Sequence, residues 1–189
     1  MSRSALTLLA IVTLFPQLAA AQAVDIARSR ITVLSRQMNV PVEAPFRKFA
    51  AQVSFDPMKP EAGAARIEID LNSFDIGDPE INESVRDRNW FDTKNHPTAR
   101  FVSSSVRALG GGRFEARGPL TIKGKSLEVV APFTVKTEGY ERIYEGAFPI
   151  RRLQYNVGDA HWRDTSVVAD EVQIRFRLYQ AMPKPAAAK

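Results

Sequence analysis

The chain has 189 residues, a formal net charge of +5 and no cysteine. A chain of this length can bury a sizeable core in one domain, and the lack of cysteine excludes a disulfide scaffold and thiolate catalysis. The mild basic charge suits an anionic membrane surface or a phosphate head group, but it does not identify a partner.

Residues 1–23 have the three-part pattern of a secretory signal peptide. Arg3 is the positive residue, and the uncharged apolar run Ala5–Phe15 is shorter than the roughly 20 residues of a membrane-spanning helix. Small residues then precede the predicted cleavage after Ala23, with cleavage after Ala21 as the alternative. No cysteine follows the run, so a lipid anchor there is excluded. We therefore expect a periplasmic protein whose domain spans residues 24–181.

Residues 30–55 contain two stretches in which apolar and polar side chains alternate, the pattern of strands that bury one face. In the first stretch, Ile31, Val33 and Ser35 share a face. Asp56-Pro57 ends the second, because proline cannot donate to a strand ladder. The apolar face of the second stretch consists of Phe49, Ala51, Val53 and Phe55.

Six further stretches alternate in the same way. The three glycines at 110–112 form a loop between two of them, and Lys123-Gly124-Lys125 predicts a tight hairpin turn. The six predicted strands lie near residues 65–71, 99–105, 114–122, 127–135, 140–148 and 172–179.

Asp78-Pro79-Glu80 predicts the start of a helix, because proline suits the first turn and acidic residues suit the positive end of the helix dipole. Ile81, Val85 and Trp90 fall near helical spacing, so the predicted helix covers residues 79–90. Residues 151–165 have a weaker pattern and predict a long loop. Residues 182–189 have no periodicity and predict a disordered tail.

Eight consecutive strands with one apolar face predict an all-β fold. Such strands hide their apolar face by stacking as a sandwich or by closing into a barrel, and closure also removes exposed edges. We expect an eight-stranded antiparallel barrel with one short helix, which is wide enough to be filled by side chains or to hold one small ligand.

No catalytic motif is present: the chain lacks a Gly-x-Ser-x-Gly turn and a phosphate-binding glycine loop. A metal site made of His96, His161 and a carboxylate is the alternative to two ordinary loop histidines, but neither belongs to a ligand motif. The acidic run from Asp75 to Asp87 lacks the spacing of a calcium loop and suits a solvated helix face. We expect no enzyme activity, no metal and no cofactor.

Five segments, in chain order, form a further pattern. They are Arg28–Val33, Phe46–Pro57, Ile67–Phe74, Asn89–Ser104 and Gly118–Gly124. In this order they resemble the YceI-like family of periplasmic polyisoprenoid-binding proteins over nearly the whole mature chain. The chain departs from the family pattern where Arg28 replaces a histidine, where Gln37-Met38 replaces His-Leu, and where Ala44-Pro45 precedes Phe46 in place of a glycine.

The resemblance implies a lipocalin-like barrel whose interior holds a polyprenyl chain, as part of a polyprenyl diphosphate or a quinone. Arg86, Arg88 and His96 are expected to meet a charged head at the mouth, and no nucleic-acid partner is expected. The apolar residues predicted to contact the lipid are Ile31, Val33, Phe49, Val53, Phe55, Ile67, Ile69, Phe91, Phe101, Leu120, Ile122, Phe133, Phe148, Ile174 and Phe176.

The phenylalanines either fill the core or line a tunnel, and periodicity does not separate these cases. A filled barrel favours a different function, an interaction module that docks on an inner-membrane redox protein. In a hollow barrel, the segment 79–90 is predicted to lie across one mouth, with Trp90 or Phe91 turned towards the cavity. The alternative is that this segment packs on the outer wall.

Overall fold

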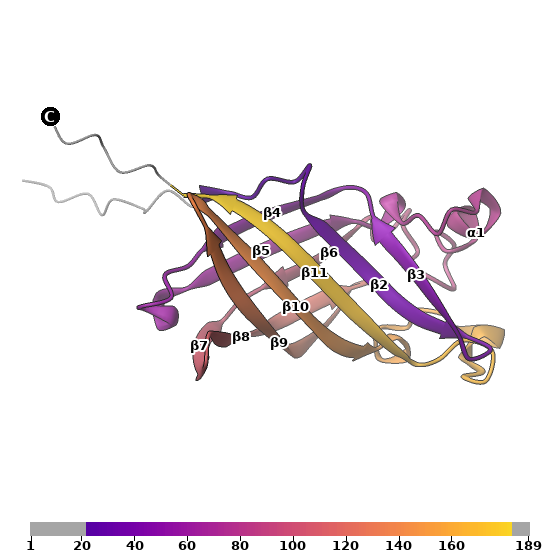
Figure 1. Cartoon of the computed structure of the whole chain (residues 1–189). Helices are drawn as coiled ribbons and strands as arrows, with labels where there is room; N and C mark the ends of the chain where they lie inside the picture. The colour runs from indigo at the N-terminus through magenta and orange to yellow at the C-terminus, as the bar shows by residue number, and fades with distance from the viewer. Residues whose placement is uncertain (1–21, 183–189) are drawn as a thin grey trace, which may run out of the picture.

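The computed structural model describes residues 22–182, which form one curled antiparallel sheet (Figure 1). The predicted signal peptide, except for Gln22 and Ala23, and the predicted tail, except for Met182, lie outside these residues. The strands are β1 (Gln22–Ala23), β2 (Arg30–Gln37), β3 (Val40–Phe46), β4 (Phe49–Ser54), β5 (Ala64–Asp70), β6 (Thr98–Val102), β7 (Ser105–Gly110), β8 (Arg113–Ile122), β9 (Lys125–Glu138), β10 (Glu141–Arg151) and β11 (Glu171–Ala181).

The all-β prediction is confirmed, and all eight predicted strands are present. Their order in the sheet is β1-β4-β5-β6-β8-β9-β10-β11-β2-β3, with β7 paired to β8. The pairing between β8 and β9 runs from Arg113 opposite Thr134 to Ile122 opposite Lys125. Lys123 and Gly124 turn this hairpin with positive φ angles of 49° and 73°, as the sequence predicted.

The sheet contains β1, β3 and β7 in addition to the predicted strands. β3 escaped prediction because Pro41 and Pro45 interrupt its alternation, and proline is tolerated there because β3 is an edge strand. β6 and β7 are separated by a step at Ser103 and Ser104. A Cβ on Gly118 would lie 2.0 Å from the carbonyl oxygen of Val102 at this step, so the crossing requires glycine.

β4 and β11 meet near the chain ends through buried polar contacts. The Gln180 side chain, 2% exposed, donates to the Val53 carbonyl at 2.7 Å and accepts from the Tyr144 hydroxyl at 2.7 Å. Val24, just after β1, forms a bridge with Gln180. These contacts join β4 to β11 and close this end of the barrel.

The opposite end carries the helix α1 (Pro79–Ser84) and the loop between β10 and β11, whereas the 3-10 helix η1 (Pro60–Ala62) lies near β7 (Figure 1). The loop contains the 3-10 helices η3 (Arg152–Tyr155) and η4 (Ala160–Arg163), and η2 (Leu71–Ser73) follows β5. The predicted loop 151–165 therefore contains two short helices. No helix in residues 22–182 is both long and apolar enough to cross a membrane.

The predicted helix over 79–90 is wrong in length. The start is as predicted, because the Asp78 carboxylate caps the helix by accepting from the backbone N–H groups of Glu80 and Ile81. The helix ends at Ser84, and the chain continues in turns up to Asp92, which has a positive φ of 52°. Adjacent residues on a helix point about 100° apart, whereas Trp90 and Phe91 both line the same cavity.

Candidate functional site

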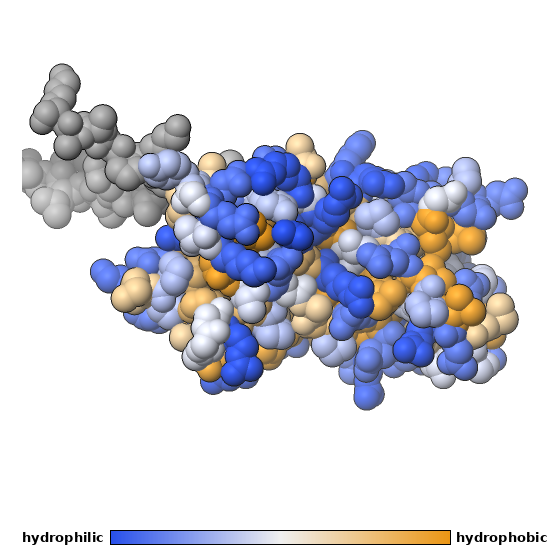
Figure 2. Space-filling view, in the orientation of Figure 1, coloured by the Kyte–Doolittle hydropathy of each residue, from blue (hydrophilic) through white to orange (hydrophobic). Residues whose placement is uncertain are grey.

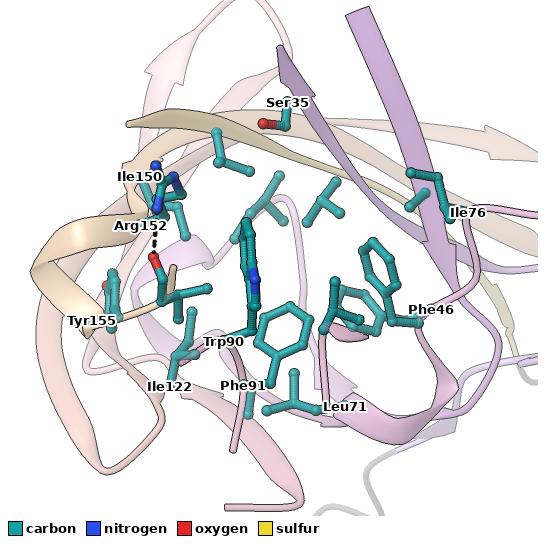
Figure 3. Close-up of a pocket in the computed structure, with 18 of the residues that line it drawn as sticks. Ser35, Phe46, Leu71, Ile76, Trp90, Phe91, Ile122, Ile150, Arg152 and Tyr155 are labelled. Carbon is teal, nitrogen blue, oxygen red and sulfur yellow. Dashed lines mark hydrogen bonds between the residues drawn. The ribbon is translucent and has the colours of Figure 1, made fainter. Parts of the chain in front are cut away.

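A cavity of about 230 Å³ lies inside the barrel at the end that carries α1 (Figure 3). Its walls come from β2, β3 and β11, with further lining residues from β5, β6, β8 and β10. Its cover comes from two segments outside the sheet. We call these segments the α1 segment (residues 74–91) and the 152–168 loop. The residues that they contribute are Phe74, Ile76, Ile81, Ser84, Val85, Trp90 and Phe91 from the first, and Arg152, Tyr155, Val157, Trp162 and Val168 from the second.

A second cavity of about 110 Å³ lies deeper, towards the closed end. The two cavities share four lining residues, so they follow one another along the barrel axis. The shared residues are Ile31, Ile69, Leu120 and Ile174. For scale, a dry apolar cavity of about 150 Å³ holds a benzene molecule. The interior is thus hollow and apolar along much of its length.

Two groups of aromatic rings mark the two ends of this space. Under the α1 segment, Phe91 packs against Phe46 and Phe74, with ring centroids 6.1 and 5.8 Å away. In the deeper part, Phe55 lies 4.9 Å from Phe114 and 5.5 Å from Phe133. Edge-on and tilted contacts of this kind favour fixed relative orientations of the rings.

The prediction that the segment 79–90 lies across a barrel mouth, with Trp90 or Phe91 turned towards the cavity, is confirmed. Five residues between 81 and 91, both of these included, line the larger cavity. The Asp75 carboxylate anchors the α1 segment by accepting from the Gly77 N–H, the Asn82 side-chain amide and the Arg47 guanidinium. These donors, the Gly77 N–H first, lower the pKa of Asp75.

The 152–168 loop is organised by Arg152, which is 3% exposed. Its guanidinium has five N–H groups, and each donates to a backbone carbonyl between 2.6 and 3.0 Å away. The acceptors are the carbonyls of Val157, Gly158, Trp162, Val168 and Ala169. Burial lowers the pKa of Arg152. Nothing in the sequence marks this residue, because its acceptors are backbone atoms, which leave no signature in the residue types.

The two covering segments also hold each other. Trp90 and Trp162 pack with ring centroids 5.3 Å apart. The Asn89 carbonyl accepts from the N–H groups of Gly158 and Asp159. Lys123, in the β8–β9 turn, donates to the Arg88 carbonyl and to the Asn156 carbonyl. Burial lowers the pKa of this lysine. The cover is therefore one connected layer.

Fourteen of the fifteen apolar residues predicted to contact a lipid line one or both cavities. Phe49 is the exception: it packs against the core without lining either cavity. Arg86, Arg88 and His96 also lie outside the lining. Arg86 donates to Glu83 and to the Asn72 carbonyl, Arg88 is exposed, and His96 lies beside Gly124. Contact between these three side chains and a head group stays a prediction.

Two hydroxyls beside the larger cavity have no hydrogen-bond partner, those of Ser35 and Tyr155. Burial raises the pKa of Tyr155 to about 12. Within residues 22–182, no cluster of three or more His, Cys, Asp or Glu residues could hold a metal ion.

The outer wall differs from this interior. Hydrophilic residues cover most of the face in Figure 2, and hydrophobic residues gather towards the end that carries α1. Met38, Val40 and Ile81 are among the exposed large apolar residues, and the Met38 N–H donates to the Val167 carbonyl of the 152–168 loop. Exposed apolar side chains are therefore present on the outside of the barrel near the cover.

Comparison with protein families gives a match to the YceI-like domain over residues 23–179. The chain is 28% identical over 118 residues to a UPF0312 protein of Azotobacter vinelandii, covering 59% of this chain and 62% of the relative. It is 29% identical over 89 residues to a UPF0312 protein of Vibrio cholerae, covering 47% of each. The match thus spans less than two thirds of the length of these curated relatives.

Among solved structures, the fold is similar to Burkholderia cenocepacia BcnA, with a TM-score of 0.82 and 48% identity over 84% of this chain and 99% of that one. A polyisoprenoid binding domain from Saccharophagus degradans, implicated in plant cell wall breakdown, gives a TM-score of 0.69 at 18% identity over 86% and 99% of the two chains. A Campylobacter jejuni YCEI protein gives 0.68 at 15% identity over 76% and 86%. The last two similarities concern the fold alone.

Proposed function

The chain belongs to the YceI-like family, and on that premise we propose that it binds a long polyisoprenoid lipid inside its barrel and carries or buffers it. The observation that carries this proposal is the pair of consecutive apolar cavities beneath a cover. The Saccharophagus degradans relative, named for polyisoprenoid binding, has the same fold and supports the same ligand class.

The energetics suit an apolar tail. Burying one five-carbon isoprene unit gains roughly 3–4 kcal/mol before costs, at about 0.8 kcal/mol per methylene. Ordering the chain and restricting its motion offset much of this gain. Several units still provide tight binding without a polar anchor, so a binding protein needs no catalytic group. The hollow interior also favours a carrier over an interaction module with a filled barrel.

The proposed site of action is the periplasm, reached through cleavage of the predicted signal peptide. Gln22 and Ala23 pair with Val53 and Gln52 of β4. This pairing favours cleavage after Ala21 over cleavage after Ala23, because only the former keeps β1. N-terminal sequencing of protein from the envelope fraction tests this, and a retained Met1 in the working protein would contradict export.

Native mass spectrometry of protein purified without detergent tests the binding function. We expect a non-covalent adduct with the mass of a polyprenyl lipid. Ala44 is buried and lines the larger cavity, so Ala44→Phe should fill the space and remove the adduct. Ala50→Phe adds the same ring at an exposed site on β4 and should keep it. The absence of any lipid adduct, or an equal adduct in both variants, would contradict binding in the barrel.

A further inference from the structure

Among the polar side chains that line the larger cavity, two have a buried hydroxyl without a hydrogen-bond partner. Tyr155 is 1% exposed, and its hydroxyl has no hydrogen-bond partner; the Ser35 Oγ is likewise buried and unpaired. Both residues line the cavity, Ser35 from β2 and Tyr155 from the 152–168 loop (Figure 3). An unpaired buried hydroxyl costs free energy, so each such group calls for an explanation.

The same cavity offers no free cation. Among the described residues that line it, Arg152 is the only charged side chain. All five of its N–H groups already donate to backbone carbonyls. A phosphate or diphosphate placed there would lose its hydration without gaining a charged partner, which is strongly unfavourable. A neutral oxygen would lose far less hydration free energy than a phosphate, and one hydrogen bond from a hydroxyl group satisfies it.

The Tyr155 hydroxyl is suited to donate a hydrogen bond to such an oxygen. Because burial raises its pKa to about 12, the hydroxyl keeps its proton throughout the physiological range. The indole of Trp90 and the ring of Phe91 face the same space (Figure 3). An oxygen-bearing head there is therefore surrounded by apolar surface, which strengthens a hydrogen bond.

We propose that the ligand carries a neutral, hydrogen-bond-accepting oxygen at its head, which lies under the cover and accepts from Tyr155. Ser35 supplies the second polar contact of this subsite. The tail extends past Ile31 and Ile174 into the deeper cavity, towards Phe55 and Phe133. This inference rests on the proposed isoprenoid binding and makes it specific: the barrel selects neutral isoprenoids over their diphosphates.

Titration of the delipidated protein with three probes of equal chain length tests this selection. The probes are geranylgeraniol, geranylgeranyl diphosphate and the headless hydrocarbon phytane. Both tryptophans line the larger cavity, so intrinsic fluorescence reports occupancy. Wild type should bind geranylgeraniol about tenfold more tightly than either other probe, the equivalent of one well-made buried hydrogen bond.

The variants locate the contact. Tyr155→Phe should weaken geranylgeraniol binding about fivefold to tenfold and leave phytane binding unchanged, and Ser35→Ala should act in the same direction. Tyr179→Phe removes a hydroxyl that lines neither cavity and should have no effect. Tyr155→Phe should also unfold at the same temperature as wild type or higher, because it removes an unpaired buried group.

The outcomes separate the two proposals. Equal affinity for the alcohol and the diphosphate, or equal weakening of the alcohol and phytane by Tyr155→Phe, would overturn the neutral-head inference and leave isoprenoid binding intact. A marked loss of stability in Tyr155→Phe would also overturn it, since the hydroxyl would then have a structural partner. Failure of all three probes to bind would remove the proposed function itself.

Discussion

Arg152 shows how one side chain can organise a whole loop. Its five hydrogen bonds gather carbonyls from residues 157–169, and Gly158 passes so close that a Cβ there would lie 2.0 Å from a guanidinium nitrogen. Charged donors to buried carbonyls are among the stronger hydrogen bonds in proteins. The guanidinium therefore serves the cover, not the ligand.

We predict that Arg152→Met lowers the free energy of unfolding by at least about 3 kcal/mol, because five buried carbonyls lose their donor. Arg152→Lys should restore only part of this loss, since an ammonium has three donors and no planar fork. Arg151→Met changes an exposed neighbour and should stay within about 0.5 kcal/mol of wild type. Urea denaturation followed by circular dichroism measures these values, and equal losses at 151 and 152 would contradict the assigned role.

We predict that Glu115 stabilises the folded state and that acid removes this contribution. Its carboxylate accepts from Arg107 at 2.6 Å and from Arg117 at 3.0 Å, and these guanidinium groups lower its pKa. The folded state therefore binds this proton less readily than the unfolded chain. The contribution is complete above the ordinary glutamate pKa and is lost as the pH falls through the lower folded value.

A comparison of stability against pH checks this prediction. We expect the unfolding free energy of wild type to fall more steeply below pH 4.5 than that of Glu115→Gln. The difference between the two proteins should shrink as the pH decreases. Glu145→Gln, at a half-buried carboxylate whose single ion-pair partner within residues 22–182 is Arg177, is the control and should follow wild type more closely. Parallel curves for wild type and Glu115→Gln would contradict the linkage.

At the scale of elements, the α1 segment depends on its anchor more than on its helix. The helix has six residues, too few to be stable alone, and Asp75 ties it to Arg47 at the β3–β4 corner. We predict that Asp75→Ala speeds dissociation of a bound isoprenoid roughly threefold to tenfold, because three hydrogen bonds that hold the cover closed are removed.

Stopped-flow displacement of a fluorescent polyprenyl analogue measures this rate. The matched control is Asp164→Ala, which removes a carboxylate that accepts two hydrogen bonds from Ser166 of its own loop. Its dissociation rate should remain near that of wild type. An unchanged rate in Asp75→Ala would indicate that the ligand leaves by a route that does not involve the α1 segment.

Phe91 is a residue of the α1 segment that faces the cavity, so a substitution there tests whether the segment contacts the ligand. We predict that Phe91→Asp reduces lipid retention far more than Arg88→Ala, because a charge replaces a ring that lines the cavity, whereas exposed charges contribute little. Quantitative lipid extraction from purified protein compares the two. Equal retention in wild type and Phe91→Asp, with folding intact, would remove the α1 segment from the binding mechanism.

At the scale of the molecule, a ligand bound inside the barrel should increase the stability of the folded protein. A ligand that binds only the folded state stabilises it by about 2.7 kcal/mol at a hundredfold excess over Kd. For a domain of this size, that corresponds to a rise of roughly 5–10 °C in Tm. Calorimetry of delipidated and reloaded protein should show the difference. Ala44→Phe should show none, and an equal rise in that variant would contradict binding in the larger cavity.

Much of the fold was predictable from local patterns. Ile31, Phe101 and Leu120 were placed inward because a strand alternates its faces with a period of two, and the barrel follows because these faces must be hidden together. The same rule fails for β3, where Pro45 occupies a position opposite Thr32 in the ladder. The predicted length of α1 was wrong. Trp90 follows Val85 at close to helical spacing, but a chain that turns back on itself can produce the same spacing.

The sequence by itself determined which side chains face the interior, because alternation is a local property of each strand. The tertiary structure alone decided that the interior is hollow, since a cavity is the volume left over when distant strands close and no residue pattern records it. It also decided the roles of Arg152, Lys123 and Gln180. Their partners are mainly backbone carbonyls brought close by the fold, and every residue type has a carbonyl, so only the folded chain reveals which one each donor meets.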